Sequence, residues 1–110
     1  MPTLNIYFCK EEKEKELEQL SIKLKSFVVK ELSGEDIALT PEEISIRLIP
    51  VKGMYMIGDI EVEIKAHAFP DRVKKQDEIC NTIRKFIEEE YSTAGKVRVW
   101  LQLSELGHSW

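Results

Sequence analysis

The chain has 110 residues, 43% of them hydrophobic and 33% charged, which suits one soluble domain with a single core and excludes a disordered or collagen-like chain. The formal net charge is −4, from 16 basic and 20 acidic residues, and no basic stripe is visible, which argues against nucleic acid as a partner. No apolar run approaches the ~18 residues of a membrane span, and no signal peptide is recognisable, so we expect a cytoplasmic protein. Cys9 and Cys80 lie far apart and are expected to be thiols rather than a disulfide.

The first half of the chain predicts a strand, a helix and a second strand. Residues 2–8 alternate between apolar and polar side chains, as in a strand with one buried face. Apolar residues then recur at steps of three and four over about residues 11–33, which predicts an amphipathic helix that stops at Gly34. A loop with a short capped turn follows over residues 35–43. Residues 44–51 alternate again as a second strand.

The second half repeats this order of elements without repeating its residues. Residues 52–58 form a glycine-containing connection that we interpret as hairpin-like, and residues 60–68 alternate as a third strand. A second helix is predicted over residues 70–91, and a fourth strand over 97–103, before a short tail. The apolar face of this second helix is carried by Val73, Ile79, Ile83, Phe86, Ile87 and Tyr91.

The element order β-α-β-β-α-β predicts a single α/β domain over residues 1–110, with two layers: a four-stranded mixed sheet and two helices on one of its faces. The other face of the sheet then carries charged and aromatic side chains, which suggests contact with other subunits or a ligand. Its expected members are Tyr7, Arg47, Ile49, Glu61, Glu63, His67, Arg98, Trp100 and Gln102. The same element order also fits a ferredoxin-like sandwich, in which the strands are ordered differently.

Four short segments are distinctive. Met1-Pro2 opens directly into a strand, Ser45-Ile46-Arg47-Leu48-Ile49 places an arginine within a strand, and residues 52–58 place Tyr55 in a glycine-flanked turn. The fourth segment, residues 100–108, includes the end of the last predicted strand. Together they resemble the tautomerase superfamily, which includes 4-oxalocrotonate tautomerase, 5-carboxymethyl-2-hydroxymuconate isomerase and macrophage migration inhibitory factor. The second segment is similar to the one with a substrate-binding arginine, the turn to one that carries a pocket aromatic, and residues 100–108 to the last strand of the carboxymethyl-hydroxymuconate isomerases.

The resemblance implies a cofactor-free tautomerase or isomerase, active as a homotrimer, that acts on a small 2-keto or 2-hydroxy acid. Removal of Met1 would leave Pro2 as a terminal secondary amine and general base. An ordinary α-amino group titrates near ~7.7–8.0, and an apolar pocket with a nearby cation lowers its pKa toward neutrality. Arg47 would bind the substrate carboxylate and Tyr55 would pack on the substrate. The strand residues Arg98, Trp100 and Gln102 would reach a neighbouring subunit's pocket.

The sequence departs from the resemblance at two places. The second arginine of the oxalocrotonate group has no counterpart, with Glu12 near that place, and the lysine of the migration-inhibitory-factor group falls near Leu39. These departures favour a monocarboxylate over a dicarboxylate substrate.

Purely structural interpretations of the same residues stay open. Pro2 is also a stiff strand opener, and Arg47 also fits a structural ion pair with Glu61 or Glu63. Neither His67 nor His108 has a partner at metal-ligand spacing, and no phosphate loop or nucleophile elbow is present, so no metal or cofactor is expected. A non-catalytic trimer of the same fold, serving binding or scaffolding, is the alternative function.

Overall fold

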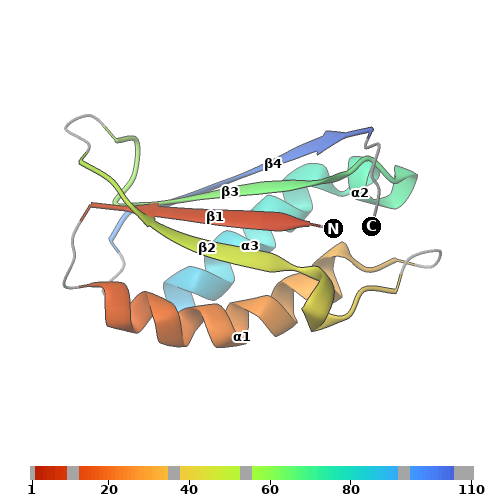
Figure 1. The fold of residues 1–110 in the computed structure, drawn as a ribbon. Helices are drawn as coiled ribbons and strands as arrows, with labels where there is room; N and C mark the ends of the chain where they lie inside the picture. The colour runs from red at the N-terminus through yellow and green to blue at the C-terminus, as the bar shows by residue number, and fades with distance from the viewer. Residues whose placement is uncertain (1, 10–12, 35–37, 53–55, 92–94, 106–110) are drawn as a thin grey trace.

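Four strands form one sheet in the order β2-β1-β3-β4, with the helices stacked against one of its faces (Figure 1). This computed structural model describes residues 2–9, 13–34, 38–52, 56–91 and 95–105. The elements are β1 (Thr3–Phe8), α1 (Glu14–Leu32), the short 3-10 helix η2 (Pro41–Glu43), β2 (Ser45–Pro50), β3 (Ile60–His67), α2 (Pro70–Lys74), α3 (Gln76–Glu90) and β4 (Val97–Ser104). The predicted order of strands and helices and the mixed sheet are therefore confirmed.

Strand adjacency decides between the two folds that share this element order. β1 pairs with β2 in parallel, β3 pairs with β4 in parallel, and β1 and β3 are antiparallel at the centre of the sheet. Each β-α-β half thus places its own two strands side by side. A ferredoxin-like sandwich instead separates the two strands of each half by another strand. The ferredoxin-like alternative is therefore wrong for this chain.

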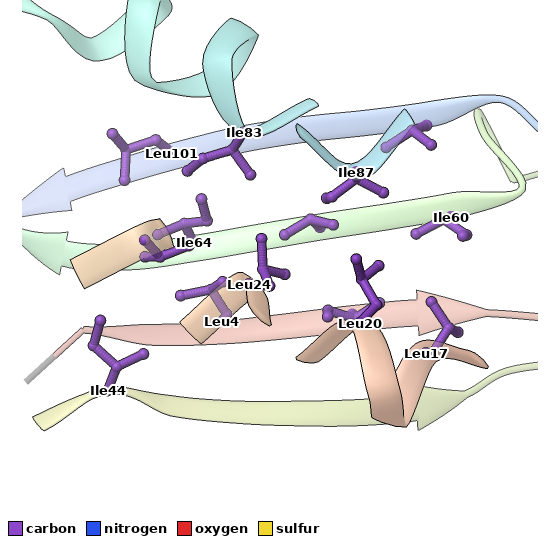
Figure 2. Close-up of a cluster of buried hydrophobic side chains, with 14 of the residues drawn as sticks. Leu4, Leu17, Leu20, Leu24, Ile44, Ile60, Ile64, Ile83, Ile87 and Leu101 are labelled. Carbon is purple, nitrogen blue, oxygen red and sulfur yellow. The ribbon is translucent and has the colours of Figure 1, made fainter. Parts of the chain in front are cut away.

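The core lies between the sheet and the two long helices (Figure 2). Even-numbered residues of β1 and β3 are buried, as period-2 alternation requires, and α1 and α3 contribute residues spaced by three or four positions. The helix residues buried against the sheet are Leu17, Leu20, Leu24, Val28 and Leu32 of α1, and Ile79, Ile83 and Ile87 of α3. Burial of this single apolar face is what holds both helices on one side of the sheet.

The end of α1 differs from the prediction that Gly34 stops the helix. Gly95 is the one described glycine with a positive φ, at 78°, so Gly34 does not provide a left-handed cap. Ser33 ends the helix instead: its Oγ donates to the Val29 carbonyl at 2.6 Å and its N–H donates to the same oxygen at 3.1 Å. The Nε of Arg72 donates to the Leu32 carbonyl at 3.1 Å. The Ser33 hydroxyl thus adds a second hydrogen bond to the Val29 carbonyl, and Arg72 satisfies a carbonyl at the end of the last helical turn.

The predicted helix over residues 70–91 is two helices, α2 and α3, separated at Lys75, whose φ and ψ are −107° and 15°. Val73 was expected on the apolar face but is 51% exposed, whereas Arg72 is only 3% exposed. The break re-aims α2 so that Arg72, rather than Val73, points inward to the end of α1. No glycine or internal proline marks Lys75, which is why residue pattern alone predicts one continuous helix.

The connection between the second and third strands is not a hairpin. β2 and β3 both pair with β1 and lie on opposite sides of it, so the connection between them does not join neighbouring strands. Tyr55 and Gly53 lie outside the described residues. The capped turn before β2 is confirmed: the Glu43 carboxylate accepts from the Thr40 N–H at 3.3 Å and from its Oγ1 at 3.1 Å.

The sequence predicts that the two cysteines are thiols and that no segment spans a membrane. Cys9 is exposed, Cys80 is half-buried, and the two form no disulfide. Of the helices in the part of the chain that the structure describes, none is long and apolar enough to cross a membrane.

Candidate active site

The open face of the sheet is organised in rows that run across all four strands. Strand register aligns Arg47, Asn5, Glu63 and Trp100 in a middle row. One row toward the start of β1 holds Ser45, Thr3, Lys65 and Gln102, and one row in the other direction holds Ile49, Tyr7, Glu61 and Arg98. The predicted open-face residues in these rows thus share one face, which also holds Asn5 and Lys65.

A hydrogen-bonded cluster occupies the centre of this face. The Glu63 Oε1 accepts from Asn5 Nδ2 at 2.9 Å and from Tyr7 Oη at 3.1 Å, and Lys65 Nζ lies 4.0 Å from the same carboxylate oxygen. The Asn5 hydrogen bond is the main cause that holds the pKa of Glu63 below its ordinary value, with Tyr7 and Lys65 adding to it and burial opposing it. Burial, and then the nearby Glu63 carboxylate, raise the pKa of Tyr7.

Asn5 is 8% exposed, and its Oδ1 is buried without a hydrogen-bond partner among the residues that the structure describes. A buried acceptor that lacks a donor is destabilising. Trp100 in the same row is 39% exposed, which is high for a large aromatic side chain.

Replacing Glu63 by glutamine is expected to destabilise the protein at neutral pH and to matter less in acid. Because the folded state lowers the pKa of Glu63, its ionised form stabilises the protein above the unfolded pKa of ~4.3, and that stability is lost as pH falls through the folded pKa. Urea unfolding of wild type and Glu63→Gln between about pH 7 and pH 3 should give free energies that converge toward low pH. Glu18→Gln, on an exposed position of α1, is the control. A difference that stays constant with pH would contradict this role.

Pro2 directly precedes β1, a central strand, and is buried. Its carbonyl accepts from the Ser45 N–H at 3.1 Å, which continues the parallel pairing of β1 with β2. The ends of β3 and β4 lie at the same end of the sheet, together with α2 (Figure 1). By alternation, Pro2 shares the side of Leu4 rather than that of Thr3.

The other predicted site residues are spread along the open face. Gln102 lies in the row nearest Pro2, Arg47 and Trp100 lie ~7 Å further along the strands, and Arg98 lies about as far again. Arg98 is half-buried, and its Nη1 donates to the Val97 carbonyl at 3.1 Å. Within one chain the structure therefore does not bring Pro2 and Arg47 together. Tyr55 lies outside the described residues.

The ion pair considered for Arg47 is not formed. β1 separates Arg47 from Glu61 and Glu63, and Arg47 is exposed with no ion pair in the described ranges. Glu61 instead accepts from the N–H groups of Ile57 and Gly58 at 2.8 and 3.4 Å and so orders the entry to β3.

Sequence reasoning did not single out Asn5 and Lys65 as candidate functional residues of this face. Alternation places both there, since Asn5 lies between Thr3 and Tyr7, and Lys65 follows Glu63 by two. Their partnership through Glu63 needs the antiparallel register of β1 and β3, which no local pattern contains. In the part of the chain that the structure describes, no group of three or more His, Cys, Asp or Glu side chains is placed to hold a metal ion.

Comparison with solved structures identifies the fold. The chain superposes on "R7 fused 4-OT wild type asymmetric trimer" with a TM-score of 0.69 and 15% identity, covering 97% of this chain and 92% of that one. For a protein of unknown function from Vibrio cholerae O1 biovar eltor str. N16961, the TM-score is 0.67 and the identity is 17%, covering 99% of this chain and 82% of that one. For a macrophage migration inhibitory factor-like protein from Entamoeba histolytica, the TM-score is 0.54 and the identity is 18%, covering 98% of this chain and 95% of that one. No family model and no curated protein match the sequence.

These likenesses, together with the strand order, show that the chain has the tautomerase-superfamily fold. The resemblance expected from the Met-Pro start and the Ser45–Ile49 segment is confirmed at the level of the fold. Fold alone does not assign a reaction, because one fold carries many functions.

Proposed function

We propose that the protein is a cofactor-independent tautomerase that uses the amine of Pro2 as its general base. The observation that carries this proposal is a buried proline as second residue, directly before a central strand of a tautomerase-superfamily fold. Burial disfavours the charged form of an amine, so the Pro2 nitrogen, once Met1 is removed, becomes a competent base near neutral pH.

The substrate class is a small 2-keto or 2-hydroxy acid. The Pro2 nitrogen takes a proton from a carbon next to the carbonyl, or from the enol oxygen, and returns it at the other position, so no atom is gained or lost. Arg47 binds the carboxylate and stabilises the negative charge of the enolate, ideally through two parallel N–H···O bonds. This assignment is supported by the exposure of Arg47 and by its having no carboxylate partner in the described chain.

The site needs more than one copy of the chain. Arg47 lies three residues along β2 from the position opposite Pro2, a separation of ~10 Å, and strand side chains stand roughly perpendicular to the sheet. We therefore propose that Arg47 of one copy meets Pro2 of another, with Trp100 and Gln102 lining the same interface. A homotrimer through the open face is supported by the likeness to a fused 4-OT trimer. It is also supported by the buried Asn5 Oδ1, which has no hydrogen-bond partner within the described part of one chain.

The assembly is tested by sedimentation equilibrium. The expected mass is three times the chain mass of 12.8 kDa, and Trp100→Glu, which adds a charge at the interface, is expected to shift it toward one chain. Ile22→Glu, on the outer surface of α1 where Ile22 is 75% exposed, is the matched control. A wild-type mass of one chain would contradict the shared site.

The activity is tested on protein whose intact mass shows that Met1 is absent. Ketonisation of enol phenylpyruvate and of 2-hydroxymuconate is followed by absorbance, with the aryl pyruvate expected to be the better substrate because it carries one carboxylate. Absence of any acceleration over buffer with both compounds, in a verified trimer, would favour a non-catalytic binding protein of this fold.

A further inference from the structure

A polar cavity lies in the helix layer, between the end of α1 and the junction of α2 and α3, away from the open face of the sheet. Its volume is about 470 Å³. The last turn of α1 lines one side, from Lys30 to Gly34, and residues of α2 and early α3 line the other. Neither Pro2 nor Arg47 belongs to its lining.

Arg72 lines this cavity and is 3% exposed. Its guanidinium donates through Nε to the Leu32 carbonyl and through Nη1 to the His67 carbonyl, both at 3.1 Å, and it lies 4.9 Å from the centre of the Phe69 ring. These partners are dipoles and an aromatic ring, and no carboxylate within 4.0 Å pairs with it among the described residues. A buried cation without a counter-ion is destabilising unless an anion can approach it.

Three lysines add positive charge to the same cavity. Lys30, Lys74 and Lys75 are exposed and stand on two sides of it. The 15-residue helix α3 begins at the same place, and no side chain of the described residues caps its N-terminus. Its first N–H groups and its dipole therefore also favour an anion.

Three carboxylates face these cations: Glu31, Asp71 and Glu78. The lining also holds four cations, Arg72 and the three lysines, so its net charge is positive. The formal charge of the whole chain, by contrast, is −4. The Asp71 carboxylate lies close to Gly34: a Cβ added at Gly34 would lie 2.8 Å from Asp71 Oδ2. The cavity therefore suits one small multivalent anion.

From this arrangement we infer a phosphate-binding site formed by Arg72, Lys74, Lys75 and Lys30 beside the first turn of α3. Its ligand is inorganic phosphate or the phosphate group of a small ester. Planar guanidinium and ammonium donors match phosphate oxygens, and the helix start supplies further N–H donors. The site is separate from the proposed tautomerase site and does not depend on it.

The test is titration of the full chain with inorganic phosphate and, separately, with methyl phosphate, followed by ¹H–¹⁵N NMR at constant ionic strength set with sodium chloride. Saturable shifts of the amides of residues 72–79 are expected. The Lys74→Ala/Lys75→Ala variant should bind about tenfold or more weakly, the loss expected when a charge-assisted contact is removed. Both lysines are exposed, so this variant is preferred over changing Arg72, which also binds the end of α1.

Lys15→Ala/Lys85→Ala is the matched control, since both lysines are exposed on helices outside the cavity and the change in net charge is the same. Its affinity should equal that of wild type. Binding of inorganic phosphate alone identifies the free anion as ligand, and equal or tighter binding of methyl phosphate identifies an ester. Equal weakening in both double variants, or shifts that do not saturate, would overturn the site.

Discussion

Protein that retains Met1 is expected to lose tautomerase activity by ~10²–10⁴ in kcat/KM relative to processed protein, the usual contribution of a positioned general base. With Met1 attached, the Pro2 nitrogen is an amide and has no basic lone pair. Pro2 is buried, and its carbonyl accepts a hydrogen bond from the Ser45 N–H. The sheet therefore holds this residue in place. The measurement is enol–keto conversion on both forms, each verified by intact mass.

Pro2→Ala provides a second arm of the same test. Alanine also permits removal of Met1 but leaves a primary amine without the rigid ring, so activity is expected to fall while the trimer persists. Thr3→Ala, on the neighbouring half-buried position, controls for disturbance of β1. Equal rates for processed wild type, Met1-retaining protein and Pro2→Ala would contradict the proline mechanism but would not affect the fold assignment.

Replacing Phe8 by alanine is expected to lower the free energy of unfolding by about 3–5 kcal/mol, the cost of deleting a buried aromatic side chain and leaving a cavity. Phe8 is fully buried and is the largest of the fully buried side chains. It lies in a central strand, so the surrounding sheet has little freedom to collapse into the space. Urea or thermal unfolding measures the loss.

Ile22→Ala is the control for this substitution, because Ile22 is 75% exposed on α1, and surface changes usually alter stability by within ~0.5 kcal/mol. A loss at Phe8 no larger than the loss at Ile22 would mean that the core between β1 and the helices is not packed as described.

The candidate active site was only partly predictable from the residues. Pro2, Arg47, Trp100 and Gln102 stand out by type and alternation, and the face that the last three share follows from a period of two along each strand. Their spacing along the sheet depends on how β1 registers with β2 and β3. The cluster of Asn5, Tyr7 and Glu63 joins residues 56 and 58 positions apart in the chain, and no local pattern contains such a contact.

What the sequence by itself determined is the set of elements and their buried faces, because hydrophobic burial imposes periods of 2 and 3.6 on the residues. It also determined the capped turn at Thr40, since Thr and Glu three residues apart satisfy each other locally. Only the tertiary structure decided the strand order, the break at Lys75 and the inward turn of Arg72. Each of these depends on which distant carbonyl or strand edge is within reach, and that is a property of the packed chain rather than of any segment of it.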